Sequence, residues 1–248
     1  MKQFLPKKLT FAQKTCMSLS GKLIHKTGMI TPGARIGVAF SGGMDSFVLL
    51  QTLLYRQRTL PFPFELMVLH INSGFSPHIH APLVDWVRER GIPSHFEVTD
   101  FGPRAHTEEN RKNSPCFFCS LLRRKRLFDL CRRYRLSHLA FGHNADDLVA
   151  NFFMNMMQNG RVNGLSPMQK FFQGKLLVVR PLLLVEKRYI RPASRRWDLP
   201  VVENPCPSAD SSNRSEVWSW LDDYIGSNRR RRNNLFNALR RWQLDLTE

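Results

Sequence analysis

Short apolar runs alternate with stretches of helical periodicity along most of this chain. Apolar runs bounded by turn residues predict strands, here at residues 35–40, 65–71, 94–98, 137–141 and 176–181. Apolar positions spaced three or four residues apart predict helices at 44–57, 81–90, 116–134, 145–158, 186–197, 213–226 and 230–243. Residues 100–115 lack periodicity and predict a loop. Strands that alternate with helices predict a parallel sheet with right-handed crossovers.

The expected fold class is therefore α/β, a Rossmann-like parallel sheet with helices on both faces. Residues 1–34 are predicted to form a basic helical lead-in and residues 35–200 the α/β domain, with a cysteine-bearing helix inserted. Residues 201–248 are predicted to form a helical, arginine-rich extension. Ligands of such sheets bind at the carboxyl ends of the strands. The residues expected at those ends are Ser41, Asn72, Gly142 and His143.

A phosphate-binding turn is predicted directly after the first strand. The segment Ser41-Gly42-Gly43-Met44-Asp45-Ser46 separates that strand from the first helix of the sheet. Two glycines let successive N–H groups point into one concavity at a helix N-terminus, which favours an anion. The hydroxyls of Ser41 and Ser46 add donors, and beside a bound polyphosphate the Asp45 carboxylate suits Mg²⁺. No Gly-Lys-Ser/Thr follows, so this is not a Walker A loop. The alternative is a plain Gly-Gly turn.

The charge of the chain indicates a polyanionic partner. Lysine and arginine exceed aspartate and glutamate by 37 − 20 = 17, and such an excess favours nucleic acid. The basic residues cluster at 123–126, 132–135, 229–232 and 240–241, although any one cluster can also be a solvated face. No apolar run approaches the ~20 residues of a membrane helix, and no signal-peptide core follows the basic N-terminus. We therefore expect a cytoplasmic protein without a membrane partner.

Two of the five cysteines form a Cys116-Phe117-Phe118-Cys119 motif that opens a basic helix. Two thiols at a helix N-terminus converge, and the helix dipole is expected to lower their pKa. Cys206, between two prolines, is the one other cysteine in a suggestive setting. Three cysteines without an obvious fourth ligand suit a [4Fe–4S] cluster with one open iron. A zinc site with three cysteines and a histidine stays open, whereas a redox dithiol is disfavoured. Cys16 and Cys131 receive no role.

A third motif, Gly142-His143-Asn144-Ala145-Asp146-Asp147, follows the fourth strand. Acids in a first helical turn can simply cap the helix. Facing a phosphate loop, the same acids can hold Mg²⁺ and the histidine can contact phosphate.

Together these motifs resemble the TtcA family, the tRNA 2-thiocytidine synthetases of the PP-loop ATP pyrophosphatase superfamily. The resemblance spans about residues 20–220 and includes Arg180-Pro181-Leu182 and the position of Cys206 before Asn213-Arg214. Three positions depart from the family pattern. Met44 replaces a lysine that is usual in the loop, Asn144 replaces a histidine, and Glu203 stands where a further cysteine is common.

The resemblance implies an ATP-dependent tRNA sulfurtransferase that adenylates the C2 carbonyl oxygen of cytidine 32 and then inserts sulfur, releasing AMP and pyrophosphate. By position, Ser41, Gly42, Gly43, Asp45 and Ser46 would bind the ATP phosphates, and His70 and Asn72 would lie near the adenosine. Gly142, His143 and Asp147 would lie by the phosphates, with Asp45 and Asp147 on Mg²⁺. Cys116, Cys119 and Cys206 would ligate the [4Fe–4S] cluster.

The same resemblance implies tRNA and a sulfur donor, either a cysteine desulfurase or free sulfide, as partners, and a homodimer as a possible assembly. Two alternatives stay open at this stage. One is another PP-loop reaction, such as a lysidine-type amination or thiolation of a different acceptor. The other is a non-catalytic RNA-binding protein with structural zinc.

Overall fold

A single mixed sheet organises the protein. The computed structural model describes residues 8–111, 113–203, 205–208 and 213–244. In this part of the chain the sheet has the order β3-β2-β1-β4-β6-β5. Its strands are β1 (Arg35–Ala39), β2 (Glu65–Asn72), β3 (Ser94–Val98), β4 (His138–Ala140), β5 (Met168–Phe171) and β6 (Leu176–Val179). β1 pairs in parallel with both β2 and β4, so the chain reverses its direction of sheet growth between β1 and β4. That switch point is where ligands bind in open α/β sheets.

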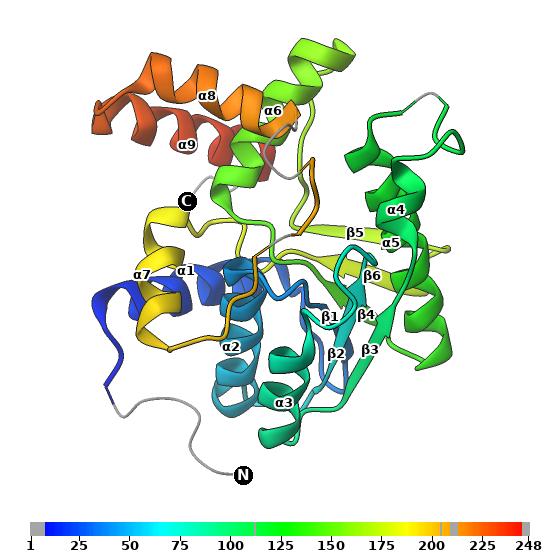
Figure 1. Cartoon of the computed structure of the whole chain (residues 1–248). Helices are drawn as coiled ribbons and strands as arrows, with labels where there is room; N and C mark the ends of the chain where they lie inside the picture. The colour runs from blue at the N-terminus through cyan, green and yellow to red at the C-terminus, as the bar shows by residue number, and fades with distance from the viewer. Residues whose placement is uncertain (1–7, 112, 204, 209–212, 245–248) are drawn as a thin grey trace.

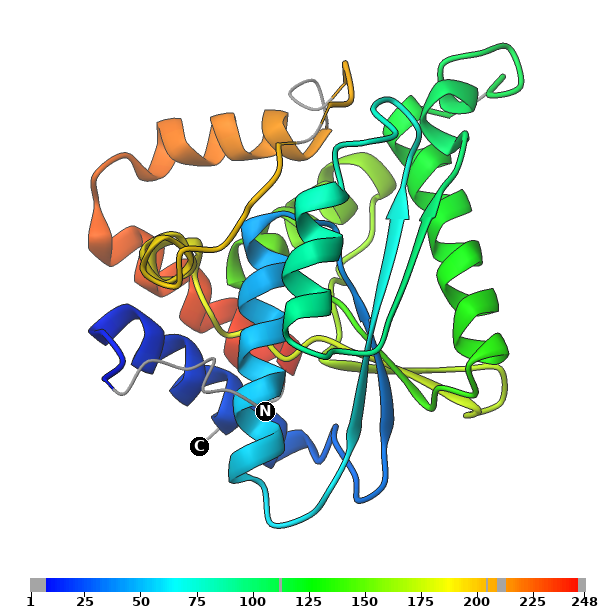
Figure 2. The same ribbon diagram turned by 60° about the horizontal axis from the view of Figure 1, so that its bottom comes forward.

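Helices cover both faces of the sheet, as predicted. On one face lie α1 (Phe11–Thr27), α2 (Met44–Thr59), α3 (Ala81–Glu89) and α7 (Lys187–Arg196); on the other lie α4 (Phe101–Ala105) and α5 (Pro115–Arg133) (Figures 1 and 2). α6 (Ala145–Asn159) follows β4 and packs against α8 (Asn213–Ile225) and α9 (Arg229–Leu244). Figure 1 shows these last helices as a pair beside α6. The predicted three-part division of the chain stays a prediction.

Two apolar cores follow from this layering. The larger one joins the α1, α2 and α7 side of the sheet to the inner faces of α6, α8 and α9, and it includes Cys16. The smaller one lies between α5 and the sheet, and it includes Cys131 and Leu130. Both cysteines are fully buried, which explains why they carry no predicted role: a buried thiol behaves as a small apolar side chain.

Two elements differ from the sequence prediction. β5, a four-residue edge strand, pairs antiparallel with β6, so the sheet is not wholly parallel. Only its two end residues are partly covered, and a run this short carries almost no periodic signal. α4 lies within the segment predicted as a loop, and its sequence contains Gly102 and Pro103, both poor helix formers. Tertiary contacts override that propensity, since Gly102 N donates to Ser73 O at 2.7 Å.

None of the helices within the described ranges is long and apolar enough to cross a membrane. Residues 1–7 and 245–248 of the predicted terminal segments lie outside the described residues.

Candidate nucleotide and cysteine site

The loop between β1 and α2 has the form expected of an anion site. Gly42 adopts a left-handed backbone with φ of 84°, which a side chain would strain. The Ser41 hydroxyl accepts from Gly43 N at 3.3 Å and lies 3.3 Å from the Ser46 hydroxyl. Gly43 is the N-cap of α2 and makes no side-chain cap. The first N–H groups of α2 are therefore presented at the loop, where the helix dipole favours negative charge.

Asp45 lies at this loop in a setting that opposes its charge. Burial raises the pKa of its carboxyl from 3.8 to about 6, although nearby Lys187 lowers it. Its Oδ1 atom is buried and accepts no hydrogen bond from the described residues. Oδ2 lies 4.0 Å from Lys187 Nζ. A buried, unsatisfied carboxylate oxygen costs free energy unless a cation or donor approaches it. A positive ligand at Asp45 would therefore stabilise its carboxylate.

The start of α6 abuts the phosphate loop. A Cβ on Gly142 would lie only 3.1 Å from the Asp45 carbonyl, so glycine permits this close approach. Asn144 and Asp147 form a capping box, in which Asn144 N donates to Asp147 Oδ2 at 3.0 Å. The capping role weighed for these acids is therefore confirmed for Asp147, and its metal role stays a prediction.

Asp146 is held in a different way. It accepts Lys187 N at 2.7 Å through Oδ2 and Arg232 Nη2 at 2.6 Å through Oδ1. Both carboxylate oxygens therefore bind the chain itself, and burial is the main cause that raises the pKa of this carboxyl.

His70, at the end of β2, lies in a cluster of aromatic rings. Its Nδ1 lies 2.8 Å from Phe40 O, and burial lowers its pKa to about 4. The imidazole is therefore neutral at pH 7, so Nδ1 donates to Phe40 and Nε2 is left as an acceptor. Nε2 is buried without a partner among the described residues. The ring lies 5.3 Å from His80 and 5.2 Å from Phe96, centroid to centroid. Flat rings and one free acceptor suit a nucleobase.

Asn72 and His143 make hydrogen bonds within the protein. The Asn72 amide donates to Ser76 O at 2.9 Å and its oxygen accepts Gly74 N at 2.9 Å, so this side chain shapes the turn after β2. His143 Nδ1 accepts Arg180 Nε at 3.3 Å. Both lie at strand ends as predicted, yet their recorded contacts are structural.

The three candidate cysteines come together from distant parts of the sequence. Cys116 and Cys119 stand in the first turns of α5, and Cys206 arrives on the segment between α7 and α8. The charge of Cys206 acts on both other thiols, and none of the three is in a disulfide. The expectation of lowered pKa values is wrong. Burial is the main cause that raises the pKa of both α5 thiols, because it disfavours the charged thiolate, and the charge of Cys206 adds to the effect.

Two side chains near these cysteines escaped the sequence analysis. Cys206 Sγ lies 4.0 Å from His106 Nε2, a histidine at the end of the unpredicted α4. Arg123, one turn after Cys119, has a buried Nε without a partner among the described residues. Its charge lowers the pKa of Cys119, and it also acts on His70. The charge of Arg123 therefore acts on both the cysteine group and the aromatic cluster at His70. In sequence it looked like one member of a solvated basic cluster.

The chain segment that carries Val202 and Cys206, called the strap below, joins the cysteine group to the phosphate loop. Val202 N donates to Gly42 O at 3.1 Å, and the chain reaches Cys206 only four residues later. A Cβ on Gly42 would lie 2.6 Å from Val202 and from Leu83, so the strap is packed closely against the loop. Figure 2 shows this segment running past α2 toward α8. The phosphate loop and the cysteine group, the two half-sites of the proposed reaction, thus lie at the same end of the sheet, where the parallel strands have their carboxyl ends.

Comparison with known proteins decides the family. The model of the PP-loop domain matches residues 18–218. A tRNA-cytidine(32) 2-sulfurtransferase from Geobacter sulfurreducens is 34% identical over 187 residues, which cover 75% of this chain and 73% of that protein. The chain belongs to the tRNA-cytidine(32) 2-sulfurtransferase family of PP-loop proteins. The predicted resemblance and the PP-loop ATP-binding fold are thereby confirmed.

Further relatives agree with this family. A tRNA-cytidine(32) 2-sulfurtransferase from Bordetella pertussis is 31% identical over 89% of this chain and 69% of that protein. Among solved structures, the U34-tRNA thiolase NcsA from Methanococcus maripaludis, solved with its [4Fe-4S] cluster, aligns with a TM-score of 0.73 at 21% identity. That alignment covers 97% of this chain and 87% of the other. It shows a shared fold.

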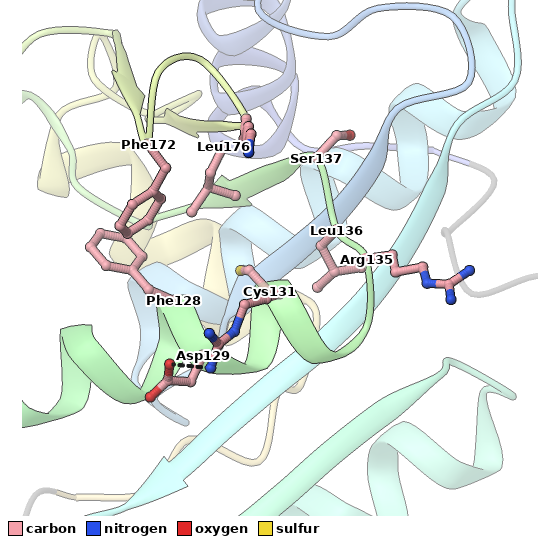
Figure 3. A pocket seen from close by; sticks show the side chains of 10 residues that line it. Phe128, Asp129, Cys131, Arg135, Leu136, Ser137, Phe172 and Leu176 are labelled. Carbon is pink, nitrogen blue, oxygen red and sulfur yellow. Dashed lines mark hydrogen bonds and ion pairs between the residues drawn. The ribbon is translucent and has the colours of Figure 1, made fainter.

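A hollow of this 2-sulfurtransferase family member lies away from the phosphate loop (Figure 3). It has a volume of about 520 Å³ and is lined in part by Phe128, Leu136, Ser137 and Leu176. Ser137 precedes β4 and Leu176 begins β6. The hollow is therefore at the amino ends of these strands, whereas the phosphate loop follows the carboxyl end of β1. It does not belong to the nucleotide site.

Proposed function

We propose that this chain is an ATP-dependent tRNA thiolase that replaces the C2 oxygen of cytidine 32 with sulfur. The observation that carries this proposal is the convergence of the two half-sites. The strap bonded to Gly42 leads to Cys206, whose charge acts on Cys116 and Cys119. Arg123 acts electrostatically on both Cys119 and His70. A base bound at this edge of the sheet can face both ATP and sulfur.

The chemistry requires two steps because a carbonyl oxygen is a poor leaving group. In the first, the C2 oxygen of the cytidine attacks the α-phosphorus of ATP; the new O–P bond forms and pyrophosphate leaves. In the second, a sulfur nucleophile attacks C2, the C–O bond breaks and AMP leaves with the oxygen. The chain's part is to position ATP through the backbone of Ser41, Gly42 and Gly43, the hydroxyl of Ser46 and the aromatic cluster at His70, and to orient the base.

The donor set fits an iron–sulfur cluster. Three thiols that form no disulfide interact electrostatically, yet within the described residues no three His, Cys, Asp or Glu side chains lie close enough to chelate one metal ion. Ligands of a cluster bind separate irons and are therefore spaced more widely. We propose that Cys116, Cys119 and Cys206 hold a [4Fe–4S] cluster. When bound, a cluster with an open iron supplies a site for the sulfide that is transferred.

We also propose that Asp45 holds Mg²⁺. Its buried oxygen without a donor and its raised pKa are the features that a cation would relieve. Carboxylates that bind Mg²⁺ together with substrate phosphates are common in ATP-using sites, and the metal would neutralise the phosphate charge. Asp147 is the second candidate ligand for Mg²⁺, since one of its carboxylate oxygens already caps α6.

Further parts of the proposal concern partners. Basic residues on α5 and at the start of α9, Arg124, Lys125, Arg229 and Arg230, are exposed and suit tRNA phosphates. Free sulfide or a cysteine desulfurase would supply the sulfur. A cytoplasmic location fits a tRNA substrate, and a homodimer is a further proposal.

The decisive experiment is nucleoside mass spectrometry combined with metal analysis. Anaerobically purified protein, incubated with unmodified tRNA, Mg·ATP and sulfide, should form 2-thiocytidine and should contain close to four irons per chain, as this cluster type requires. Cys119→Ala should lose the brown colour and the product. Cys16→Ala, which changes a thiol buried in the core, should keep both.

One observation favours a second candidate. His106 Nε2 lies 4.0 Å from Cys206 Sγ and would be the fourth ligand if the three cysteines closed around a zinc ion; as they lie, the described side chains are too far apart to chelate one ion. One equivalent of zinc, no iron and no release of pyrophosphate would support a non-catalytic RNA-binding protein and contradict the thiolase. A colourless, iron-free protein that still consumes ATP on tRNA would instead indicate another PP-loop reaction, such as a lysidine-type amination.

A further inference from the structure

Lys187 brings a positive charge to a phosphate loop that contains no basic side chain. The segment Ser41–Ser46 contains one acid and no lysine or arginine. Met44, inside this segment, packs against the apolar core. Lys187 opens α7, more than a hundred residues later in the sequence, and its Nζ lies 4.0 Å from Asp45 Oδ2. The fold thus places an ammonium beside the loop from a separate element.

The backbone of Lys187 is fixed to the same site. Lys187 N donates to Asp146 Oδ2 at 2.7 Å. Just before it, Val185 O accepts Ala145 N at 3.0 Å, so the starts of α6 and α7 are tied together twice. Asp146 is in turn held by Arg232. These bonds set the distance from the α-carbon of Lys187 to the phosphate loop and leave only the side chain to adjust.

The ammonium group has donors to spare. Its separation from Asp45 is the outer limit of an ion pair and is too long for a hydrogen bond. Across the described residues no other hydrogen bond or ion pair of this ammonium is recorded. The side chain is 39% exposed, so part of it is accessible from solvent. An ammonium carries three N–H donors and binds phosphate as a point charge.

We propose that Lys187 binds the polyphosphate of ATP directly through its ammonium group. This inference rests on the proposed function, because it requires that the loop bind ATP. Lys187 then acts as a substrate-binding residue that supplies from α7 the cation that Met44 does not supply from the loop. The competing explanation is that Lys187 only neutralises Asp45, without contacting the nucleotide.

The first test compares nucleotides that differ in phosphate number. Binding of the non-hydrolysable ATP analogue AMPPNP with Mg²⁺, and separately of AMP, is measured by calorimetry on the full chain. Lys187→Met should weaken AMPPNP binding by about ten-fold or more, the effect of losing one charge-assisted hydrogen bond. Binding of AMP should change less than about two-fold, because the contact is to the outer phosphates. Lys187→Arg should recover much of the loss.

The matched control is Lys175→Met, which changes a lysine at the far hollow of Figure 3 and should leave both affinities unchanged. Thermal unfolding of each variant shows whether the fold is kept. An equal loss of AMPPNP and AMP affinity in Lys187→Met would indicate general damage and overturn the inference, as would an unchanged AMPPNP affinity. Wild-type protein that binds no AMPPNP would instead overturn the proposed use of ATP.

A double-mutant comparison separates direct contact from neutralisation of Asp45. If Lys187 contacts phosphate, Lys187→Met should still weaken AMPPNP binding in an Asp45→Asn background. If it only offsets the Asp45 charge, the second substitution should have no effect there, and the inference fails. Coupling of this kind between neighbouring residues is what such cycles measure.

Discussion

At the scale of single residues, burial disfavours the ionised form of the Asp45 carboxyl, the form that the proposed binding of Mg²⁺ requires. The pKa of its carboxyl is raised from 3.8 to about 6, so the folded chain holds this proton more tightly than the unfolded chain does. Stability therefore falls as the pH rises from about 4 through 6, and the full loss applies above that range. The proposed Mg²⁺ would offset this cost, because an ionised carboxylate is the form that binds a cation.

We expect Asp45→Asn to stabilise the protein while it impairs nucleotide-dependent activity. Without metal and at pH 7.5, the gain in the free energy of unfolding should be up to about 3 kcal/mol, the energy of a shift from 3.8 to about 6. The gain should shrink as the pH is lowered towards 4, because the wild-type carboxyl then keeps its proton. Urea unfolding in EDTA at several pH values measures this.

The control for this prediction is Asp85→Asn, which changes a carboxylate whose side chain is 66% exposed. Its effect should stay within about 0.5 kcal/mol at every pH. A destabilised Asp45→Asn protein at pH 7.5 would show that the carboxylate is already stabilised by a partner in the folded chain.

At the scale of elements, one arginine of the 229–232 cluster serves a different purpose from its neighbours. Arg232 donates to Asp146 Oδ1 at 2.6 Å and to Glu186 Oε2 at 3.4 Å. It thereby joins α9 to the start of α6 and to the N-cap of α7. The acids it contacts are 7% and 13% exposed. Removal of the guanidinium would take a charged partner from two buried acids and leave Asp146 with Lys187 N and Glu186 with Arg188.

We predict that Arg232→Met destabilises the protein by about 2 kcal/mol, less than a fully buried pair would lose because its own side chain is 25% exposed. The variant should also weaken AMPPNP binding, since Asp146 holds the backbone of Lys187. Arg230→Met, two residues away and exposed, should change neither quantity. Urea unfolding and calorimetry measure both effects, and equal behaviour of the two variants would contradict the assigned role of Arg232.

At the scale of the whole molecule, the net charge is +17, and its basic side chains are of two kinds: some form ion pairs within the fold and others are exposed to solvent. Arg126 pairs with Glu97 at 2.7 Å, and Arg232 is bound as described. Arg229 and Arg230 are exposed at the start of α9. Only cations free to release counterions contribute to the salt dependence of nucleic-acid binding. The tertiary structure therefore narrows the basic clusters to a smaller set of expected tRNA contacts.

We expect Arg229→Gln combined with Arg230→Gln to weaken tRNA binding and to reduce the slope of log affinity against log salt by about 1 to 2, close to one per phosphate contact. Filter binding at several salt concentrations gives this slope. Arg58→Gln, an exposed arginine in the last turn of α2, should leave it unchanged. An unaltered slope in the double variant would make this part of α9 a solvated face.

Much of the fold could be predicted because its signals are local. The strand at 94–98 was predicted with its observed bounds, and most other boundaries differ by one or two residues. Caps and glycines set these ends, as the Asn144–Asp147 capping box does for α6. The glycines of the phosphate loop likewise specify their turn by backbone sterics alone. β5 and α4 were not predicted. β5 is too short to show an alternating apolar pattern, and α4 forms despite the low helix propensity of its residues.

The sequence by itself determined which chemical groups this protein carries: a phosphate turn with an acid, a pair of cysteines and an excess of arginine. Only the tertiary structure decided which of them meet. Lys187 at Asp45, His106 at Cys206 and Arg232 at Asp146 join residues 86 to 142 positions apart. No local preference encodes such pairs, since they arise when packed helices and a parallel sheet bring remote segments to one edge.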